Sequence, residues 1–106
     1  MAGPNEAFRK AIDILAKSDE SLKGRLVGAC VEIFVMQTGP KRLPSDLQER
    51  VDKLLKDVSQ NESVGCEGRM VATIEKMRLG EAQDCVEIIL NTYEEIIQRG
   101  IKDYPV

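Results

Sequence analysis

The longest apolar stretch of the chain, Leu26 to Met36, limits what this sequence can fold into. It reads Leu-Val-Gly-Ala-Cys-Val-Glu-Ile-Phe-Val-Met and contains one charged residue, Glu32. A helix needs about 20 residues to cross a bilayer, so this stretch is too short to span a membrane. Its β-branched residues leave a strand as the competing interpretation, but the run is longer than a typical strand and contains no turn residues. We therefore interpret it as part of a helix buried in protein.

The residues around the run extend this helix in both directions. Ser18, followed by two acidic residues, is typical of a helix N-cap. Gly39 and Pro40 indicate that the helix ends near Gln37. Glu32 falls with Arg25 on one narrow polar stripe of the predicted helix. A buried Glu32 would be a candidate general acid or base, but its place on this stripe favours a solvated carboxylate.

Four further helices are indicated by apolar residues that recur at intervals of three and four. Pro4 suits the first turn of a helix, Ser45 and Gln48 match a capping box, and Gly100 suits a left-handed C-terminal cap. The five predicted helices cover residues 4–17, 18–37, 45–58, 67–77 and 81–99. We predict a single all-α domain over residues 1–106, a compact bundle of about five helices with the second and fifth at its centre.

Composition and charge narrow the class of protein. Hydrophobic residues make up 42% of the chain and charged residues 31%, which is typical of a soluble globular protein. The net charge is −3 and the two signs alternate along the chain, which argues against attraction to a nucleic acid. The start of the sequence does not resemble a secretory signal, and we therefore predict a cytoplasmic location and no contact with a membrane.

The three cysteines, Cys30, Cys66 and Cys85, are widely spaced, and the chain contains no histidine. This pattern fits neither a disulfide framework nor a zinc site, and we predict free thiols, no metal and no cofactor. Cys66 is the candidate for a reactive thiol, because nearby glycines suggest exposure at the start of a helix. The nearest basic residue is Arg69 and no histidine is present to act as a base, which favours an unreactive cysteine.

No catalytic constellation or nucleotide-binding loop is apparent, and we predict that the protein is not an enzyme. The preferred hypothesis is a small cytosolic helical module for protein–protein interaction or regulation, acting as a homodimer or as a component of a complex. The second and fifth helices motivate it, because both carry apolar residues beyond a single stripe. The candidate interaction residues are Val27, Val31, Val35, Met36, Leu90 and Ile97.

Two alternative functions come from other classes. The first is a thiol-based redox or catalytic protein that uses Cys66. The second is a nucleic-acid-binding regulator in which the second and third helices flank the break at Gly39 to Pro44. That break is longer than the tight turn of a helix-turn-helix motif, and the third helix is rich in acidic residues.

Overall fold

The protein, seen in a computed structural model, is all-α over the residues that the structure describes, 3–37, 43–63 and 65–103. No strand occurs in these ranges, and the predicted bundle of about five helices is confirmed. The helices are α1 (Pro4–Lys17), α2 (Leu22–Gln37), α3 (Ser45–Asp57), α4 (Gly65–Glu75) and α5 (Leu79–Gln98).

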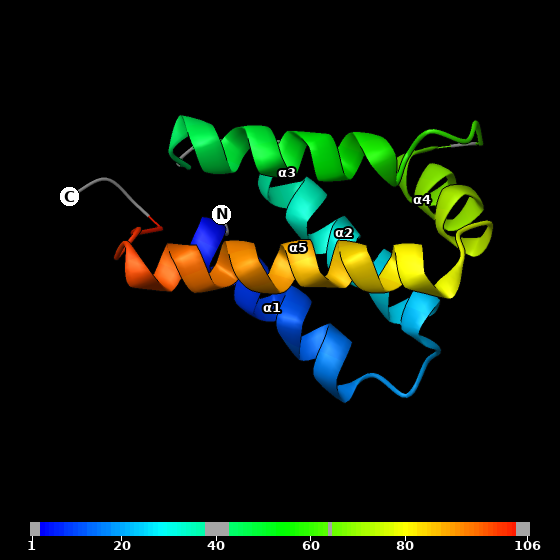
Figure 1. Ribbon diagram of the computed structural model, residues 1–106, viewed down its shortest axis with the longest axis horizontal. Helices are drawn as coiled ribbons and strands as arrows, with labels where there is room; N and C mark the ends of the chain where they lie inside the picture. Colours follow the sequence, from blue (N-terminus) through cyan, green and yellow to red (C-terminus); the bar gives the residue numbers. More distant parts are fainter. Residues whose placement is uncertain (1–2, 38–42, 64, 104–106) are drawn as a thin grey trace.

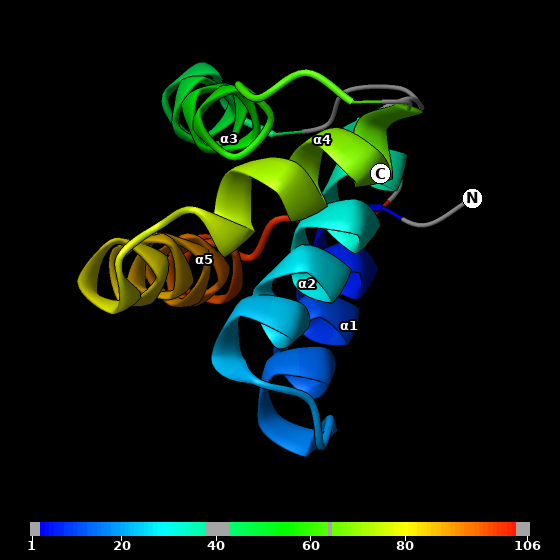
Figure 2. The same cartoon turned by 90° about the vertical axis from the view of Figure 1, so that its right-hand side faces the viewer.

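The helices form two pairs, α1 with α2 and α3 with α5, and α4 packs against α2. Helices α1 and α2 lie side by side, while α3 and α5 run along the longest axis of the molecule (Figures 1 and 2). Helix α2 contacts α1, α4 and α5, and α5 contacts α1, α2 and α3, so the predicted central position of these two helices is confirmed. The most extensive contact in the bundle is between α1 and α2.

All five helices contribute to one hydrophobic core. Gly28, within the apolar run, allows α1 to approach α2 closely, since a Cβ atom there would lie 3.1 Å from Cγ2 of Ile14. The two helices can therefore pack with little space between their backbones. The largest fully buried apolar side chains of the core include Phe8, Leu26, Ile33, Leu47, Met70, Ile74, Ile89 and Ile96.

Helix α2 begins later than predicted. Ser21 takes the N-cap role, because its Oγ accepts a hydrogen bond from the Gly24 N–H at 3.2 Å. The Oγ of Ser18 instead accepts from the Glu20 N–H at 3.2 Å, within the connection that precedes the helix. The predicted start at Ser18 is therefore wrong. Gln37 is the last residue of α2, as predicted, and the break at Gly39 and Pro40 lies outside the described residues.

The predicted capping box of α3 does not form. Pro44 occupies the N-cap position and makes no side-chain cap hydrogen bond. The buried amide of Gln48 donates instead to Asp52 Oδ1 at 3.0 Å and to Gln37 Oε1 of α2. Gln48 therefore joins α3 to α2. Helix α3 ends at Asp57, one residue before the predicted end at position 58.

Helices α4 and α5 also differ from the prediction at their ends. Helix α4 covers Gly65–Glu75, two residues earlier than predicted at both ends. Helix α5 begins at Leu79, before the predicted start at 81, because the Glu81 carboxylate accepts a hydrogen bond from the Arg78 N–H at 3.0 Å. Its predicted C-terminal cap is confirmed. Gly100 has φ +64°, and the Ile101 N–H donates to the Ile96 carbonyl at 3.1 Å.

Candidate interaction surface

Three large apolar side chains lie exposed in a line along α5. Leu79 is 58% exposed, Leu90 41% and Ile97 52%. Their separations of eleven and seven residues correspond to about three and two helical turns, which places them on one face. Val86 and Tyr93 lie along the same face and are half-buried against the core. We call Leu79, Val86, Leu90, Tyr93 and Ile97 the α5 stripe.

The α5 stripe is distinct from the face with which α5 packs into the bundle. Ile96 is completely buried, whereas its neighbour Ile97 is more than half exposed. Among the described residues, the one other large apolar side chain with comparable exposure is Val35 of α2, at 54%. The buried residues of α5 are Ala82, Cys85, Ile89, Thr92 and Ile96.

Acidic residues follow one side of the stripe. Glu87 and Glu94 precede Leu90 and Ile97 by three residues each, so they lie next to them on the helix surface. Both glutamates are exposed, and neither forms an ion pair with any described residue. Glu94 accepts a single hydrogen bond, from Gln98 at 3.3 Å. We call Glu87 and Glu94 the acid row.

The charge of α5 is entirely negative. From Leu79 to Gln98 the helix carries five carboxylates and neither lysine nor arginine. Glu81 contributes to the N-terminal capping box of α5, and Glu95 is held by arginine side chains. The acid row is therefore exposed with no cation supplied by its own helix, although Glu94 also lines a groove to which α3 contributes Arg50 and Lys53.

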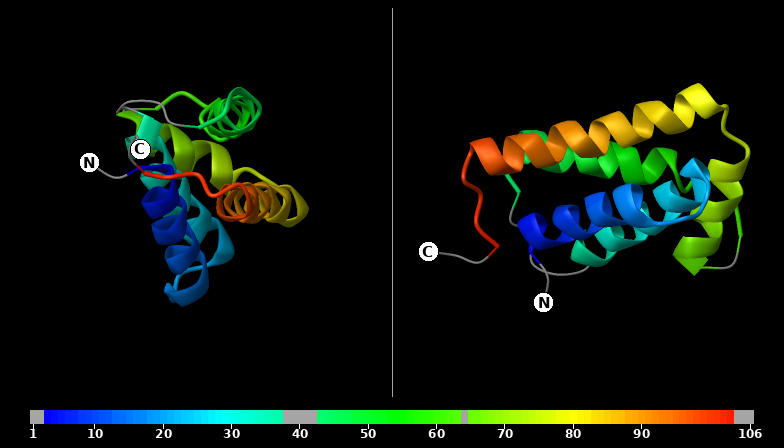
Figure 3. Two further views of the ribbon diagram at one scale, coloured as in Figure 1. Left: turned by 90° about the vertical axis from the view of Figure 1, so that its left-hand side faces the viewer. Right: turned by 90° about the horizontal axis from the view of Figure 1, so that it is seen from below.

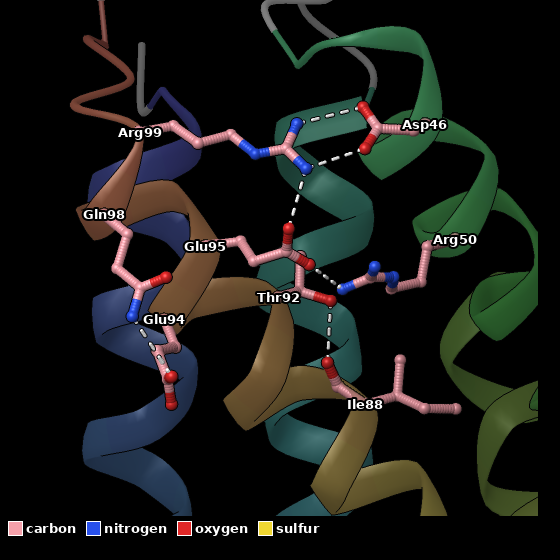
Figure 4. A network of polar contacts seen from close by, with 8 residues as sticks. All are labelled: Asp46, Arg50, Ile88, Thr92, Glu94, Glu95, Gln98 and Arg99. Atoms are coloured by element: carbon pink, nitrogen blue, oxygen red, sulfur yellow. Dashed lines mark hydrogen bonds and ion pairs between the residues drawn. The ribbon is translucent and has the colours of Figure 1, made fainter.

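An ion-pair cluster joins another side of α5 to α3 (Figure 4). The Arg99 guanidinium donates to both carboxylate oxygens of Asp46, at 3.0 and 2.8 Å, and to Glu95 at 2.7 Å. Arg50 of α3 donates to the second oxygen of Glu95 at 2.6 Å. The hydrogen bond from Arg99 lowers the pKa of Asp46 to about 2, and hydrogen bonds from Arg50 and Arg99 lower the pKa of Glu95. These carboxylates are thus already neutralised within the chain.

A groove of about 570 Å³ runs between α3 and α5. Leu54 and Ile88 line it, with Arg50 and Lys53 contributed by α3 and Glu94 by α5. Asp57 of α3 and Glu95 of α5 also line it, so both signs of charge are present and neither dominates. This mixture identifies no particular class of ligand.

A second groove, of about 580 Å³, lies between α2 and α4. Val27 and Val71 contribute apolar surface to it. The Lys23 ammonium at its edge donates to the carbonyls of Glu75 and Met77, at 3.1 and 2.5 Å. Lys23 therefore caps the C-terminal end of α4, where cations are favourable.

The residues predicted as an interaction surface occupy different environments. Leu90 and Ile97 share the α5 stripe. Val27 and Val31 of α2 are half-buried and Val35 is exposed.

Met36, also predicted for this surface, is 8% exposed and belongs to the core, so it does not line an exposed surface. Leu79 was not among the predicted surface residues, because the helix was expected to begin at 81. Its spacing of eleven residues from Leu90 is the signal that identifies it once the helix starts at 79.

The two thiols whose side chains the structure describes, Cys30 and Cys85, are buried. Burial raises the pKa of the Cys30 thiol to about 12 and also raises the pKa of Cys85. Cys66 lies in α4, but its side chain is outside the described part of the structure. Glu32 is half-buried. The described residues include no group of three or more acidic or cysteine side chains placed to hold a metal ion.

Comparisons with known proteins found no match to this chain. No family model matches the chain, and no curated protein or solved structure matches it. Within the described ranges, none of the helices combines the length and the apolar character needed to cross a membrane. The α5 stripe and its acid row are the features on which a functional proposal can be built.

Proposed function

We propose that this protein is a non-enzymatic interaction module that binds a partner protein through the α5 stripe. The observation that carries the proposal is the alignment of Leu79, Leu90 and Ile97, all exposed, on one face of one helix. Several exposed apolar side chains gathered on one helix face are typical of an interaction site. A cytoplasmic location and membership of a complex belong to the same proposal.

The stripe has the dimensions of a helix-binding surface. From Leu79 to Ile97 it extends about 27 Å along the helix axis, at about 1.5 Å per residue. Complete burial of a leucine or isoleucine side chain stabilises by about 1.5–3 kcal/mol relative to full exposure. Tyr93, in the same stripe, belongs to a residue type enriched at the centres of interfaces. A partner that covers the stripe would therefore gain a favourable contribution that the isolated chain lacks.

The thiol-based alternative has less support than the interaction module. Cys30 and Cys85 are buried, so that alternative depends on Cys66 alone. Burial raises the pKa of both thiols, which disfavours the thiolate that redox or nucleophilic chemistry requires. The interaction module, in contrast, is supported by a specific arrangement of side chains on α5.

Site-specific photo-crosslinking tests the proposal. The full chain would carry a benzophenone amino acid in place of Ile97 or Leu90, expressed in the cell from which the protein comes. Control chains would carry it in place of Gln60 or Glu62, which are exposed polar residues between α3 and α4. We expect a discrete adduct from the two stripe positions and none from the controls. The same adduct pattern from all four positions would overturn the proposal.

The mass of the adduct also identifies the kind of partner. An adduct of two copies of the 11.8 kDa chain would indicate a homodimer, and any other discrete mass would indicate a different protein. Sedimentation velocity over a range of concentrations would check the first result independently.

A further inference from the structure

We infer that the partner bound at the α5 stripe is a basic amphipathic helix, whose apolar face covers Leu90 and Ile97 and whose lysine or arginine side chains pair with Glu87 and Glu94. This inference rests on the proposed function and specifies the partner. It is carried by the combination of the exposed stripe with the acid row beside it.

The preference for a basic partner follows from the positions of Glu87 and Glu94 relative to the α5 stripe. Leu90 has Glu87 three residues before it and Glu94 four residues after it, and Ile97 has Glu94 three residues before it. Side chains at these separations are neighbours on a helix surface. A helix that packs on Leu90 and Ile97 would therefore bring its own flanking residues within reach of both carboxylates.

These carboxylates can accept new partners without loss of an existing ion pair. Glu95 already binds Arg50 and Arg99, at 2.6 and 2.7 Å, and a competing cation would have to displace them. Glu87 and Glu94 make no ion pair with the described residues. Charge complementarity at the edge of an interface favours the correct partner and accelerates association.

The same charges disfavour a second copy at this surface. An antiparallel pair of α5 helices, packed stripe on stripe, would bring the acid row of each copy beside that of the other. Helix α5 contains no lysine or arginine with which to form ion pairs across such an interface. Like charges opposed across an interface suppress association, so a basic partner is preferred to a copy of this chain.

The sequence of such a partner helix would have a definite spacing of apolar and basic residues. Its apolar residues would recur every three or four positions, as in helices that bind a complementary surface. To cover the stripe it would need about 18 residues, because a helix rises about 1.5 Å per residue. Lysine or arginine three or four positions from the apolar residues would meet the acid row.

Two synthetic peptides test this inference on the full-length protein. Both would be fluorescent amphipathic helices of about 21 residues with identical leucine positions. One would carry lysine at the flanking positions and the other glutamate. Fluorescence anisotropy is expected to give a Kd at least about tenfold lower for the lysine peptide, with an affinity that falls between about 50 and about 500 mM salt.

Charge-reversal variants test whether Glu87 and Glu94 cause the difference in affinity between the two peptides. The double variant Glu87→Lys, Glu94→Lys is expected to reverse the preference between the two peptides. The control Glu49→Lys, Glu62→Lys changes the net charge equally at exposed positions away from the stripe and should retain the preference for lysine. Ile97→Ser is expected to weaken binding of the lysine peptide at least about tenfold.

Several outcomes would overturn the inference. Equal affinities for the two peptides would show that charge does not select the partner, and an equal effect of the two double variants would show a nonspecific response to net charge. A photo-crosslink from position 97 to a second copy would also contradict a basic partner. In each case discrete crosslinks from the stripe would leave the proposed function standing, whereas their absence would remove the proposed function itself.

Discussion

Asp103 caps the first helix through the backbone of Asn5, 98 residues away in the sequence. One carboxylate oxygen accepts the Asn5 N–H at 2.6 Å and the other accepts the Glu6 N–H at 3.2 Å. Gly3 occupies the N-cap position of α1 and makes no side-chain cap hydrogen bond. The segment that follows α5 returns across the molecule to the start of α1 (Figure 3). The carboxylate thus satisfies two backbone donors that a helix leaves without intrahelical partners.

Removal of this cap should destabilise the protein. We predict that Asp103→Ala lowers the free energy of unfolding by about 1 kcal/mol, the usual effect of losing a capping side chain. Gly3→Ser should also destabilise, although serine generally favours an N-cap, because a Cβ atom at Gly3 would lie 2.5 Å from the Asp103 Cβ. Urea unfolding of both variants would be compared with Lys102→Ala, an exposed neighbour. An Asp103→Ala variant as stable as that control would contradict the capping role.

The pairing of Arg99 with Asp46 predicts a loss of stability in acid. The pKa of Asp46 is about 2 in the folded chain, below the value of about 3.9 expected when unfolded. Because the pKa is lowered by folding, ionised Asp46 stabilises the folded state above about pH 4, and this stabilisation is lost as the pH falls towards about 2. The stability difference between wild type and Arg99→Gln should therefore shrink across this window. Urea unfolding at about pH 6, 4 and 3 would measure it.

The matched control for this pH series is Arg9→Gln, which removes an exposed arginine that forms no ion pair with the described residues. The difference in the free energy of unfolding between Arg9→Gln and wild type should change less with pH. If the Arg99 and Arg9 variants respond alike, the ion pair with Asp46 does not contribute to the acid response.

Substitution of two adjacent isoleucines should change the stability of the protein to very different extents. Ile96 is 0% exposed and Ile97 is 52% exposed. We predict that Ile96→Ala lowers the free energy of unfolding by about 2–5 kcal/mol, because it leaves a cavity in the core. Ile97→Ser should change it by less than about 0.5 kcal/mol. A large loss of stability in Ile97→Ser would show that this residue supports the fold, and would remove it from the proposed binding surface.

The Cys30 thiol should be unreactive in the folded protein. With a pKa of about 12, roughly one thiol in 10,000 is ionised at about pH 8. We predict that iodoacetamide alkylates Cys30 at least about a hundredfold more slowly in the native chain than in urea. Peptide mass spectrometry would follow the reaction site by site. Equal rates in the two conditions would be inconsistent with burial of Cys30 between the helices.

Patterns that depend on neighbouring residues could be predicted from the sequence. The periodicity of apolar residues placed all five helices, and Gly100 was correctly assigned to the left-handed cap of α5. Helix periodicity and caps act within a few residues, so one sequence contains the necessary information. Leu90 and Ile97 could be predicted as surface residues for the same reason, because they lie beyond the width of one buried stripe, and both are exposed.

Features that depend on the packing of distant segments could not be predicted. Gln48 was assigned to a local capping box, but its amide bonds Gln37 on another helix. Arg99 and Asp46 are 53 residues apart, and no pattern along the chain relates them. Met36 and Val35 are adjacent in the apolar run, yet one is buried and the other exposed, because the neighbouring helices determine which face of α2 they cover.

The central claim is that the outer face of α5 binds a partner, and chemical-shift mapping tests it most directly. The ¹⁵N-labelled full chain would be titrated with the lysine peptide described above. We predict that the largest amide shifts fall between Val86 and Ile97 of α5, with small shifts in α2 between Val27 and Val35. Shifts centred on α2 or on either groove would contradict the assignment of the α5 stripe as the binding surface. No shifts at the highest peptide concentration would contradict a basic helical partner.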